Sequence, residues 1–244
     1  MRTKTISSFL LFGRRPIWCV AWLATLACCA LVRADEPAVE PANEFVRWES
    51  TIRQFENRDR ESPPPKGSVL FAGSSSARLW DVEQSFPDLE AINRGFGGSV
   101  IADSTHFAER FILPLEPRIV VLYAGDNDLS RGKSPEAVAA DFRAFVEKVR
   151  KGLPEVKIVF IGIKPSIRRW NLWEKMRQAN GLTRAECEKD EALVFVDVAP
   201  AMLGDDGRPR KELFVADGLH LSEEGYAVWT KLVAPHLTVS GATK

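Results

Sequence analysis

The sequence predicts an α/β fold in which a mostly parallel sheet of five strands lies between two layers of helices. Three observations predict this three-layer, doubly wound arrangement. Five short apolar segments recur along the chain, segments with helical periodicity separate them, and the apolar segments are continuous rather than alternating. Continuous apolar strands are typical of sheets covered on both faces. Strands that alternate with helices are joined by right-handed crossovers into a parallel sheet.

The helical segments follow one another in a regular order. Phe45, Trp48, Ile52 and Phe55 have helical spacing, and Pro63–Pro65 end that first helix. The last helix is expected behind a serine N-cap at position 222. Helices are expected near residues 100–112, 135–153, 168–191 and 223–237.

The strands are expected where short apolar segments are bounded by glycine, proline or polar residues. These segments are residues 68–72, 90–93, 118–124, 156–163 and 193–198. The sequence shows no internal repeat and no second domain. We therefore expect a leader with an N-terminal helix over residues 35–66 and one domain over residues 67–240.

The amino-terminal 34 residues are typical of an export signal. They contain five basic residues and no acid, an apolar segment from Pro16 to Val32, and small residues at Val32 and Ala34. Cleavage after Ala34 is expected to release a periplasmic or extracellular chain without stable membrane insertion. The alternatives are a retained membrane anchor and a lipoprotein site at Cys28 or Cys29, although Thr25 lies where that site requires leucine.

Composition limits the class of the exported chain. The full sequence has 33 Lys and Arg against 33 Asp and Glu, so the 34-residue segment with its five basic residues leaves 28 against 33. This acidic balance excludes a nucleic acid held by broad electrostatic attraction. Three of the four cysteines precede residue 35, so no internal disulfide is expected and Cys187 is interpreted as structural.

Polar and glycine-rich segments follow the expected strands at their carboxyl ends, where open α/β sheets bind ligands. The first strand is followed by Gly73-Ser74-Ser75-Ser76, the second by Asn93 through Ser99, and the third by Gly125-Asp126-Asn127-Asp128. Asp217-Gly218-Leu219-His220 stands near the carboxyl terminus. The topology is expected to bring these segments to one edge of the sheet.

The histidines indicate the chemistry that this edge could perform. A serine hydroxyl needs a nearby base to become a nucleophile, and the chain has three histidines. His106 lies in a helical pattern, and His236 lies at a helix end where it would meet the helix dipole. His220 follows Asp217 by three residues, so one loop can supply a base and the carboxylate that orients it.

The four segments together resemble blocks I, II, III and V of the SGNH or GDSL family of esterases and acylhydrolases, over roughly residues 68–237. The family's first block usually reads Gly-Asp-Ser, whereas Ser74 replaces the acid here. The resemblance implies the flavodoxin-like SGNH hydrolase fold. It also implies a triad of Ser75, Asp217 and His220, and an oxyanion hole formed by the backbone N–H groups of Ser75 and Gly98 and the side-chain amide of Asn127.

No cofactor or metal is expected. Residues 95–100 lack the third glycine of a dinucleotide-binding loop, because Val100 stands in its place. The Asp126–Asp128 segment lacks the glycine and the closing glutamate of a calcium loop, whose positions hold Arg131 and Ala137. No Cys and His cluster suits zinc.

The sequence therefore predicts a secreted serine esterase that cleaves acyl esters through an acyl-enzyme, with short-chain or carbohydrate O-acetyl esters as substrates. Trp170 and Trp173 follow the fourth strand and are possible substrate contacts. Two other functions stay open: acyl transfer to a sugar acceptor, and a non-catalytic module that binds carbohydrate or phosphate at the Ser74–Ser76 loop. Labelling of Ser75 by a fluorophosphonate separates an enzyme from such a module.

Overall fold

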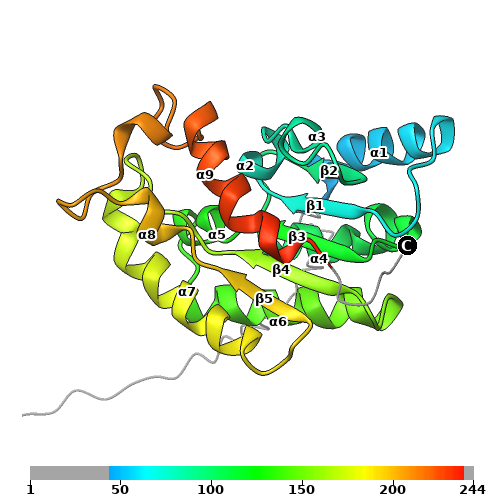
Figure 1. Ribbon diagram of the computed structural model, residues 1–244. Helices are drawn as coiled ribbons and strands as arrows, with labels where there is room; N and C mark the ends of the chain where they lie inside the picture. Colours follow the sequence, from blue (N-terminus) through cyan, green and yellow to red (C-terminus); the bar gives the residue numbers. More distant parts are fainter. Residues whose placement is uncertain (1–43, 239–244) are drawn as a thin grey trace, which may run out of the picture. The chain divides into compact units, whose positions relative to one another are not determined.

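A parallel five-stranded sheet forms the centre of the domain. The computed structural model describes residues 44–238, so the expected signal and the leader up to residue 43 lie outside the described residues. The strands have the spatial order β2-β1-β3-β4-β5, and all neighbouring pairs are parallel (Figure 1). The predicted three-layer fold is thus confirmed. The strands are β1 (Val69–Gly73), β2 (Ala91–Gly95), β3 (Ile119–Tyr123), β4 (Lys157–Ile161) and β5 (Leu193–Val196).

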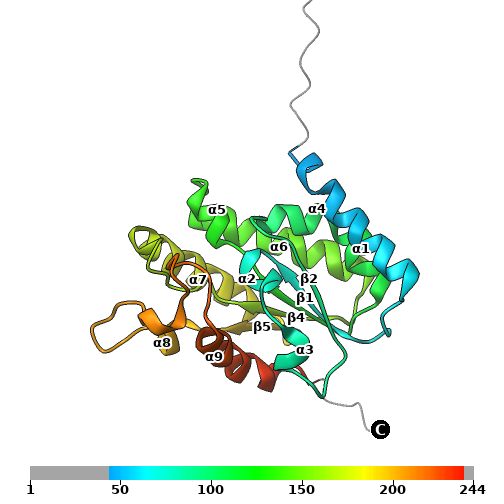
Figure 2. The same ribbon diagram turned by 90° about the horizontal axis from the view of Figure 1, so that it is seen from above.

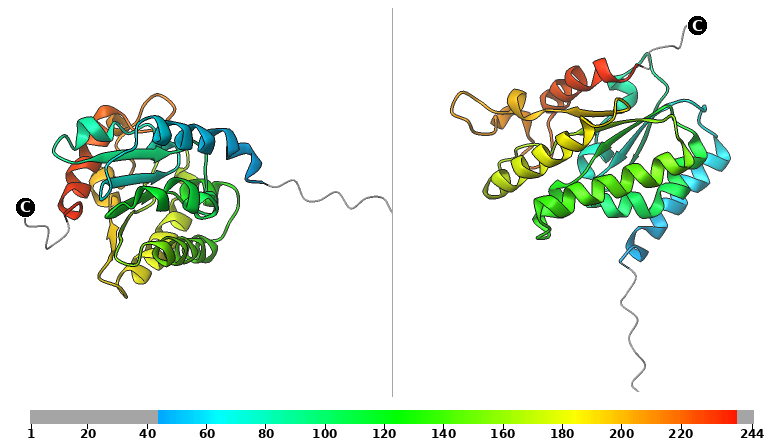
Figure 3. Two further views of the ribbon diagram at one scale, coloured as in Figure 1. Left: turned by 90° about the vertical axis from the view of Figure 1, so that its right-hand side faces the viewer. Right: turned by 90° about the horizontal axis from the view of Figure 1, so that it is seen from below.

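Helices cover both faces of this sheet (Figure 2). On one face α1, α4, α6 and α7 pack side by side, in that order (Figure 3). The opposite face is covered by α9 together with the short helices α2, α3 and α8. The helices are α1 (Glu49–Glu61), α2 (Ser75–Arg78), α3 (Val82–Ser85), α4 (Ile101–Phe111), α5 (Asp126–Ser130), α6 (Pro135–Gly152), α7 (Trp173–Cys187), α8 (Ala199–Met202) and α9 (Glu223–Val233).

Helix ends follow local signals in most places. The Ser222 side chain accepts a hydrogen bond from the Gly225 N–H at 3.2 Å and so caps α9 as predicted. The helix expected over residues 168–191 is shorter, because α7 begins at Trp173. Residues before it form a loop whose backbone is held at Ile163 by the Asn180 side chain, which both donates to the Ile163 carbonyl and accepts from its N–H.

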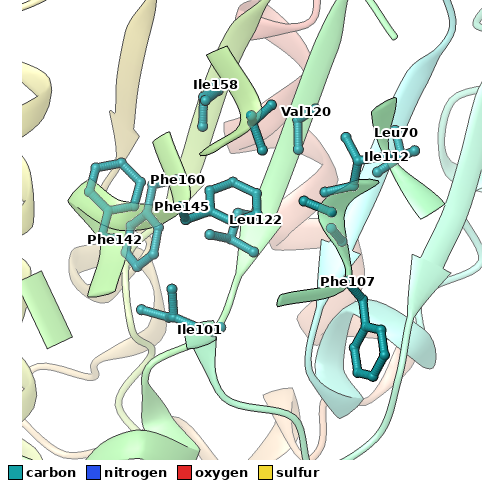
Figure 4. Close-up of a cluster of buried hydrophobic side chains, with 14 of the residues drawn as sticks. Leu70, Ile101, Phe107, Ile112, Val120, Leu122, Phe142, Phe145, Ile158 and Phe160 are labelled. Carbon is teal, nitrogen blue, oxygen red and sulfur yellow. The ribbon is translucent and has the colours of Figure 1, made fainter. Parts of the chain in front are cut away.

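The strands separate two apolar clusters because their side chains alternate between the two faces. Leu70, Val120 and Ile158 belong to the cluster beneath α4 and α6 (Figure 4). Val69, Val121 and Val159 belong to the cluster beneath α9, in which Trp229 is fully buried. Both faces of the central strands are therefore shielded from solvent, which explains their continuous apolar sequences.

Cys187 lies at the end of α7 and is a buried, free thiol, as expected for a structural cysteine. Burial raises its pKa to about 12, so the thiol stays protonated near neutral pH. Between residues 44 and 238, no helix combines the length and the apolar character needed to cross a bilayer.

Candidate active site

The segments singled out in the sequence meet at the carboxyl edge of the sheet. Gly73, the last residue of β1, lies in register with Gly95 of β2 and with Tyr123 of β3. The chain beyond β1 and β3 leads into α2 and α5 at the same end of the sheet (Figure 1). Because the strands are parallel and end together, the loops that carry Ser75, Gly98 and Asn127 begin side by side.

Ser75, His220 and Asp217 form one chain of polar contacts. The Nε2 atom of His220 lies 2.9 Å from the Ser75 Oγ atom, although the residues are 145 positions apart. The Nδ1 atom of His220 lies 2.5 Å from Asp217 Oδ2. An ionised carboxylate only accepts hydrogen bonds, so Nδ1 bears the proton and Nε2 presents its lone pair to the serine hydroxyl.

Asp217 is held in its ionised form by its own loop. Burial opposes ionisation, but the backbone N–H groups of His220 and Leu219 and the His220 ring outweigh it and lower the Asp217 pKa to about 2. Its Oδ1 atom accepts from the Leu219 and His220 N–H groups at 2.8 and 2.9 Å. Asp217 is therefore charged at any pH near neutrality and cannot rotate away from the imidazole without losing these bonds.

The turn that carries Ser75 needs glycine at its base. Gly73 has a φ of +115°, and a Cβ atom at this position would lie 1.9 Å from the Tyr123 carbonyl oxygen. The Ser74 N–H donates to that same carbonyl at 2.9 Å, which leads the chain into α2. Ser74, which replaces the acid of the family pattern, is buried, and its hydroxyl has no hydrogen-bond partner within residues 44–238.

Two side chains, those of Arg131 and Trp48, lie against the second loop. Gly98 has a φ of +81°, a backbone conformation that side chains disfavour. Its carbonyl accepts from the Arg131 side chain at 2.6 Å, and the six-membered ring of Trp48 lies 3.7 Å from the position of a Cβ atom on Gly98. The N–H groups of Ser75 and Gly98 donate to no other group in the described part of the chain. Both are thus free to bind a substrate oxygen.

Asn127 lies near the start of α5, where its side chain is anchored at both ends. Its Nδ2 atom donates to the Ser99 carbonyl at 3.0 Å, and its Oδ1 atom accepts from Arg169 at 2.9 Å. The Ser99 contact links α5 to the loop that contains Gly98. The structure therefore joins Ser75, His220 and Asp217 by direct contacts and links Asn127 to the loop of Gly98, at the same edge of the sheet.

Comparison with known proteins identifies the family of the chain. The model of the GDSL-like lipase/acylhydrolase family matches residues 70–228, which is more than half of the chain. The chain belongs to this family. The resemblance predicted from the four segments is thus confirmed, and the matched region contains every residue of the candidate site.

Individual relatives of this GDSL-like chain share the same domain. The platelet-activating factor acetylhydrolase IB subunit alpha1 of Homo sapiens is 31% identical over 189 residues, covering 74% of this chain and 78% of the human protein. A GDSL-like lipase of Bacteroides thetaiotaomicron has a TM-score of 0.66 at 17% identity, over 77% of this chain and 97% of its own. A carbohydrate esterase family 3 protein of Talaromyces cellulolyticus has a TM-score of 0.56 at 16% identity, over 69% and 95%.

Of the tryptophans predicted as substrate contacts, Trp170 lies in the segment that connects β4 to α7, and Trp173 is the first residue of α7. Trp170 and Trp173 stack on each other with ring centroids 5.9 Å apart, and the Arg208 guanidinium lies 5.1 Å from the centroid of the Trp170 ring. Trp173 also packs against the apolar cluster beneath α4 and α6. Their contact with substrate stays a prediction.

The other two histidines of this GDSL-like chain have different surroundings. His106 stacks on Phe45 at 3.8 Å between ring centroids. The pKa of His236 is lowered by burial and by the charge of Lys157, so the favourable effect of a helix carboxyl end on its charged form does not dominate. Neither histidine approaches a serine and a carboxylate in the way that His220 does.

Sequence reasoning missed three side chains close to the candidate site: Trp48, Lys164 and Arg169. Arg169 contacts Asn127, whereas Lys164 contacts Ser76, the neighbour of Ser75. Lys164 is buried, and its amino group donates to Ser76 Oγ and Tyr123 Oη at 3.0 Å each. Burial lowers the pKa of Lys164. A signal for Lys164 was present, since it directly follows the fourth apolar segment at the edge where the candidate site residues lie, and Arg169 follows five residues later.

Proposed function

We propose that the chain is an exported serine esterase that cleaves short-chain or carbohydrate O-acetyl esters through an acyl-enzyme. The contact of 2.9 Å between His220 Nε2 and Ser75 Oγ is the observation that carries this proposal. It supplies a base for the hydroxyl, and Asp217 at 2.5 Å fixes the tautomer that can act as a base. Membership of the acylhydrolase family supports the same reaction class.

The reaction has two halves. In the first, Ser75 Oγ attacks the ester carbonyl while its proton passes to His220 Nε2, and the protonated imidazole returns that proton to the departing alcohol. In the second, water attacks the acyl-enzyme carbonyl while His220 takes a proton from that water. The protonated imidazole then returns this proton to Ser75 Oγ as the bond between Oγ and the acyl carbon breaks and the carboxylic acid leaves. In both halves the negative charge on the carbonyl oxygen would be bound by the N–H groups of Ser75 and Gly98 and by the Asn127 amide.

The names of two similar proteins support an acetyl group and a carbohydrate ester, respectively. The human relative is named an acetylhydrolase, and the Talaromyces cellulolyticus neighbour is a carbohydrate esterase. The first name specifies acetate as the acyl group that is released. A carbohydrate ester is a substrate that an exported enzyme could meet outside the cell. We therefore favour acetyl over long-chain acyl esters.

Two assays test this proposal. A fluorophosphonate probe is expected to label the wild-type protein covalently and to leave Ser75→Ala unlabelled, while Ser76→Ala, one position further along α2, keeps the label. Among 4-nitrophenyl esters, acetate is expected to give a higher kcat/KM than butyrate or decanoate, and acetylated xylan is expected to release acetate. A folded wild-type protein that takes no label and cleaves none of these esters would instead support a binding module.

A further inference from the structure

The loop between β4 and α7 places one guanidinium group against two consecutive residues of α5. The Arg169 side chain is 17% exposed, and its Nη1 atom lies 2.9 Å from the Asp126 carboxylate, which is 6% exposed. Its Nη2 atom donates to Asn127 Oδ1 at 2.9 Å. Arg169 therefore contacts a proposed oxyanion donor and is itself fixed by a buried counter-charge.

This contact decides which end of the Asn127 amide faces the guanidinium. Arginine has only donors, so the atom that faces Arg169 must be the oxygen Oδ1. The nitrogen Nδ2 then lies on the other side of the amide, where one of its two N–H groups donates to the Ser99 carbonyl at 3.0 Å. The second N–H has no partner between residues 44 and 238, so it is available for a substrate oxygen.

An oxyanion donor needs this orientation. The reversed amide would present lone pairs to the developing negative charge and to the Ser99 carbonyl. A protonated guanidinium on Oδ1 also draws electron density from the amide, which strengthens its N–H groups as donors. Donors that are already oriented stabilise a transition state without reorganisation during the reaction.

The same loop is anchored on the other parts of the site. The Lys164 amino group lies 3.7 Å from the Asp126 carboxylate and donates to Ser76, the neighbour of the nucleophile. The Arg168 N–H donates to the Gly218 carbonyl at 3.0 Å, inside the loop that carries Asp217 and His220. The segment from Lys164 to Arg169 is therefore tied to the nucleophile turn, to α5 and to the loop of the base.

We propose that Arg169 is a positioning residue that orients and polarises the Asn127 amide for the oxyanion. The proposal rests on the esterase function proposed above. A guanidinium that served only as a structural ion pair to Asp126 would stabilise the fold without changing the transition state, and this difference can be measured.

A double-mutant cycle between Arg169 and Asn127 tests the proposal in the full-length protein. Arg169→Met is expected to lower kcat for 4-nitrophenyl acetate by about tenfold or more. The loss should not exceed the roughly 10²- to 10³-fold loss that follows removal of an oxyanion donor. KM is expected to change less than about twofold. Asn127→Ala is expected to lose at least as much. The double variant is expected to be no slower than Asn127→Ala, because Arg169 acts through that amide. Losses that multiply would overturn the proposal.

A transition-state analogue supplies a readout that a structural role would not move. Phenylboronic acid adds to Ser75 Oγ as a tetrahedral boronate, so its affinity should fall in Arg169→Met by the same factor as kcat/KM. Unchanged affinity for the boronic acid would overturn the proposal. A wild-type protein with neither esterase activity nor boronic acid binding would instead contradict the proposed function itself.

Two further variants separate positioning from folding. Arg169→Lys keeps the positive charge, but its single amino group cannot replace the two guanidinium nitrogens that contact Asp126 and Asn127. This variant is therefore expected to recover part of the kcat that is lost in Arg169→Met. The same cycle can be run with this variant if Arg169→Met does not fold. Arg184→Met is the matched control, because it removes another arginine–aspartate pair, 2.5 Å to Asp197, from the adjoining helix α7. Its kcat is expected to equal that of the wild type, and an equal loss in both variants at matched thermal midpoints would overturn the proposal.

Discussion

Asp217 is the residue whose surroundings define the electrostatics of the candidate triad. Its loop lowers its pKa to about 2 against an ordinary value of 3.8, so its ionised form is favoured in the folded protein. The stabilisation from this shift is present above about pH 4 and is lost as the pH falls toward 2.

Asp217→Asn tests this assignment. An amide can turn its N–H toward His220 and stabilise the wrong tautomer, so kcat for 4-nitrophenyl acetate is expected to fall by about three to four orders of magnitude. Asp206→Asn is the control, because Asp206 also accepts a backbone N–H in a turn but lies in an exposed loop. Its kcat should match that of the wild type. A rate for Asp217→Asn within tenfold of the wild type would exclude Asp217 as the orienting carboxylate.

At the scale of elements, the segment that leads into α1 supports the oxyanion loop. Trp48 packs edge-to-face on Phe96, with ring centroids 5.3 Å apart, and its ring lies beside Gly98. Arg47 forms an ion pair of 3.1 Å with the buried carboxylate of Asp103, which accepts the Val100 N–H at the start of α4. The segment before α1 therefore packs against the loop that contains Gly98, although it precedes the region that the family model matches.

Trp48→Ala is expected to lower both stability and activity. Removal of a half-buried indole should cost about 1–3 kcal/mol in the free energy of unfolding, below the range for fully buried aromatic residues. Loss of its contact with the Gly98 loop should also lower kcat/KM for 4-nitrophenyl acetate by about tenfold. Val46→Ala is the control, because Val46 lies two positions earlier and is 62% exposed. It should change the free energy of unfolding by no more than about 0.5 kcal/mol and should leave kcat/KM unchanged. Urea unfolding and steady-state kinetics measure both. Unchanged kinetics in Trp48→Ala would contradict the supporting role.

At the scale of the whole molecule, the described domain is stabilised by two apolar clusters, and its one cysteine is a free thiol. The absence of a disulfide between residues 44 and 238 leaves core burial as the main source of stability. The expected export is tested by following the chain itself.

Export is expected to produce a chain that begins at Asp35. The first 34 of the 244 residues should be removed, leaving 210, and mass spectrometry of the periplasmic and medium fractions of a bacterial host measures this directly. Leu26→Arg, which interrupts the apolar segment, should leave the full-length chain in the cell. An intact amino terminus in the membrane fraction would support the retained anchor, and a lipid-modified Cys28 or Cys29 would support the lipoprotein.

The sequence by itself determined the layers of the fold and the positions of the site residues, because both depend on local patterns. Continuous apolar segments specify strands that are buried on both faces, and the Asp217–His220 spacing places base and carboxylate on one loop. Only the tertiary structure decided which distant side chains meet. The contacts of His220 with Ser75, of Arg169 with Asn127 and of Trp48 with Phe96 join separate elements, and their geometry follows from how those elements pack rather than from any local spacing.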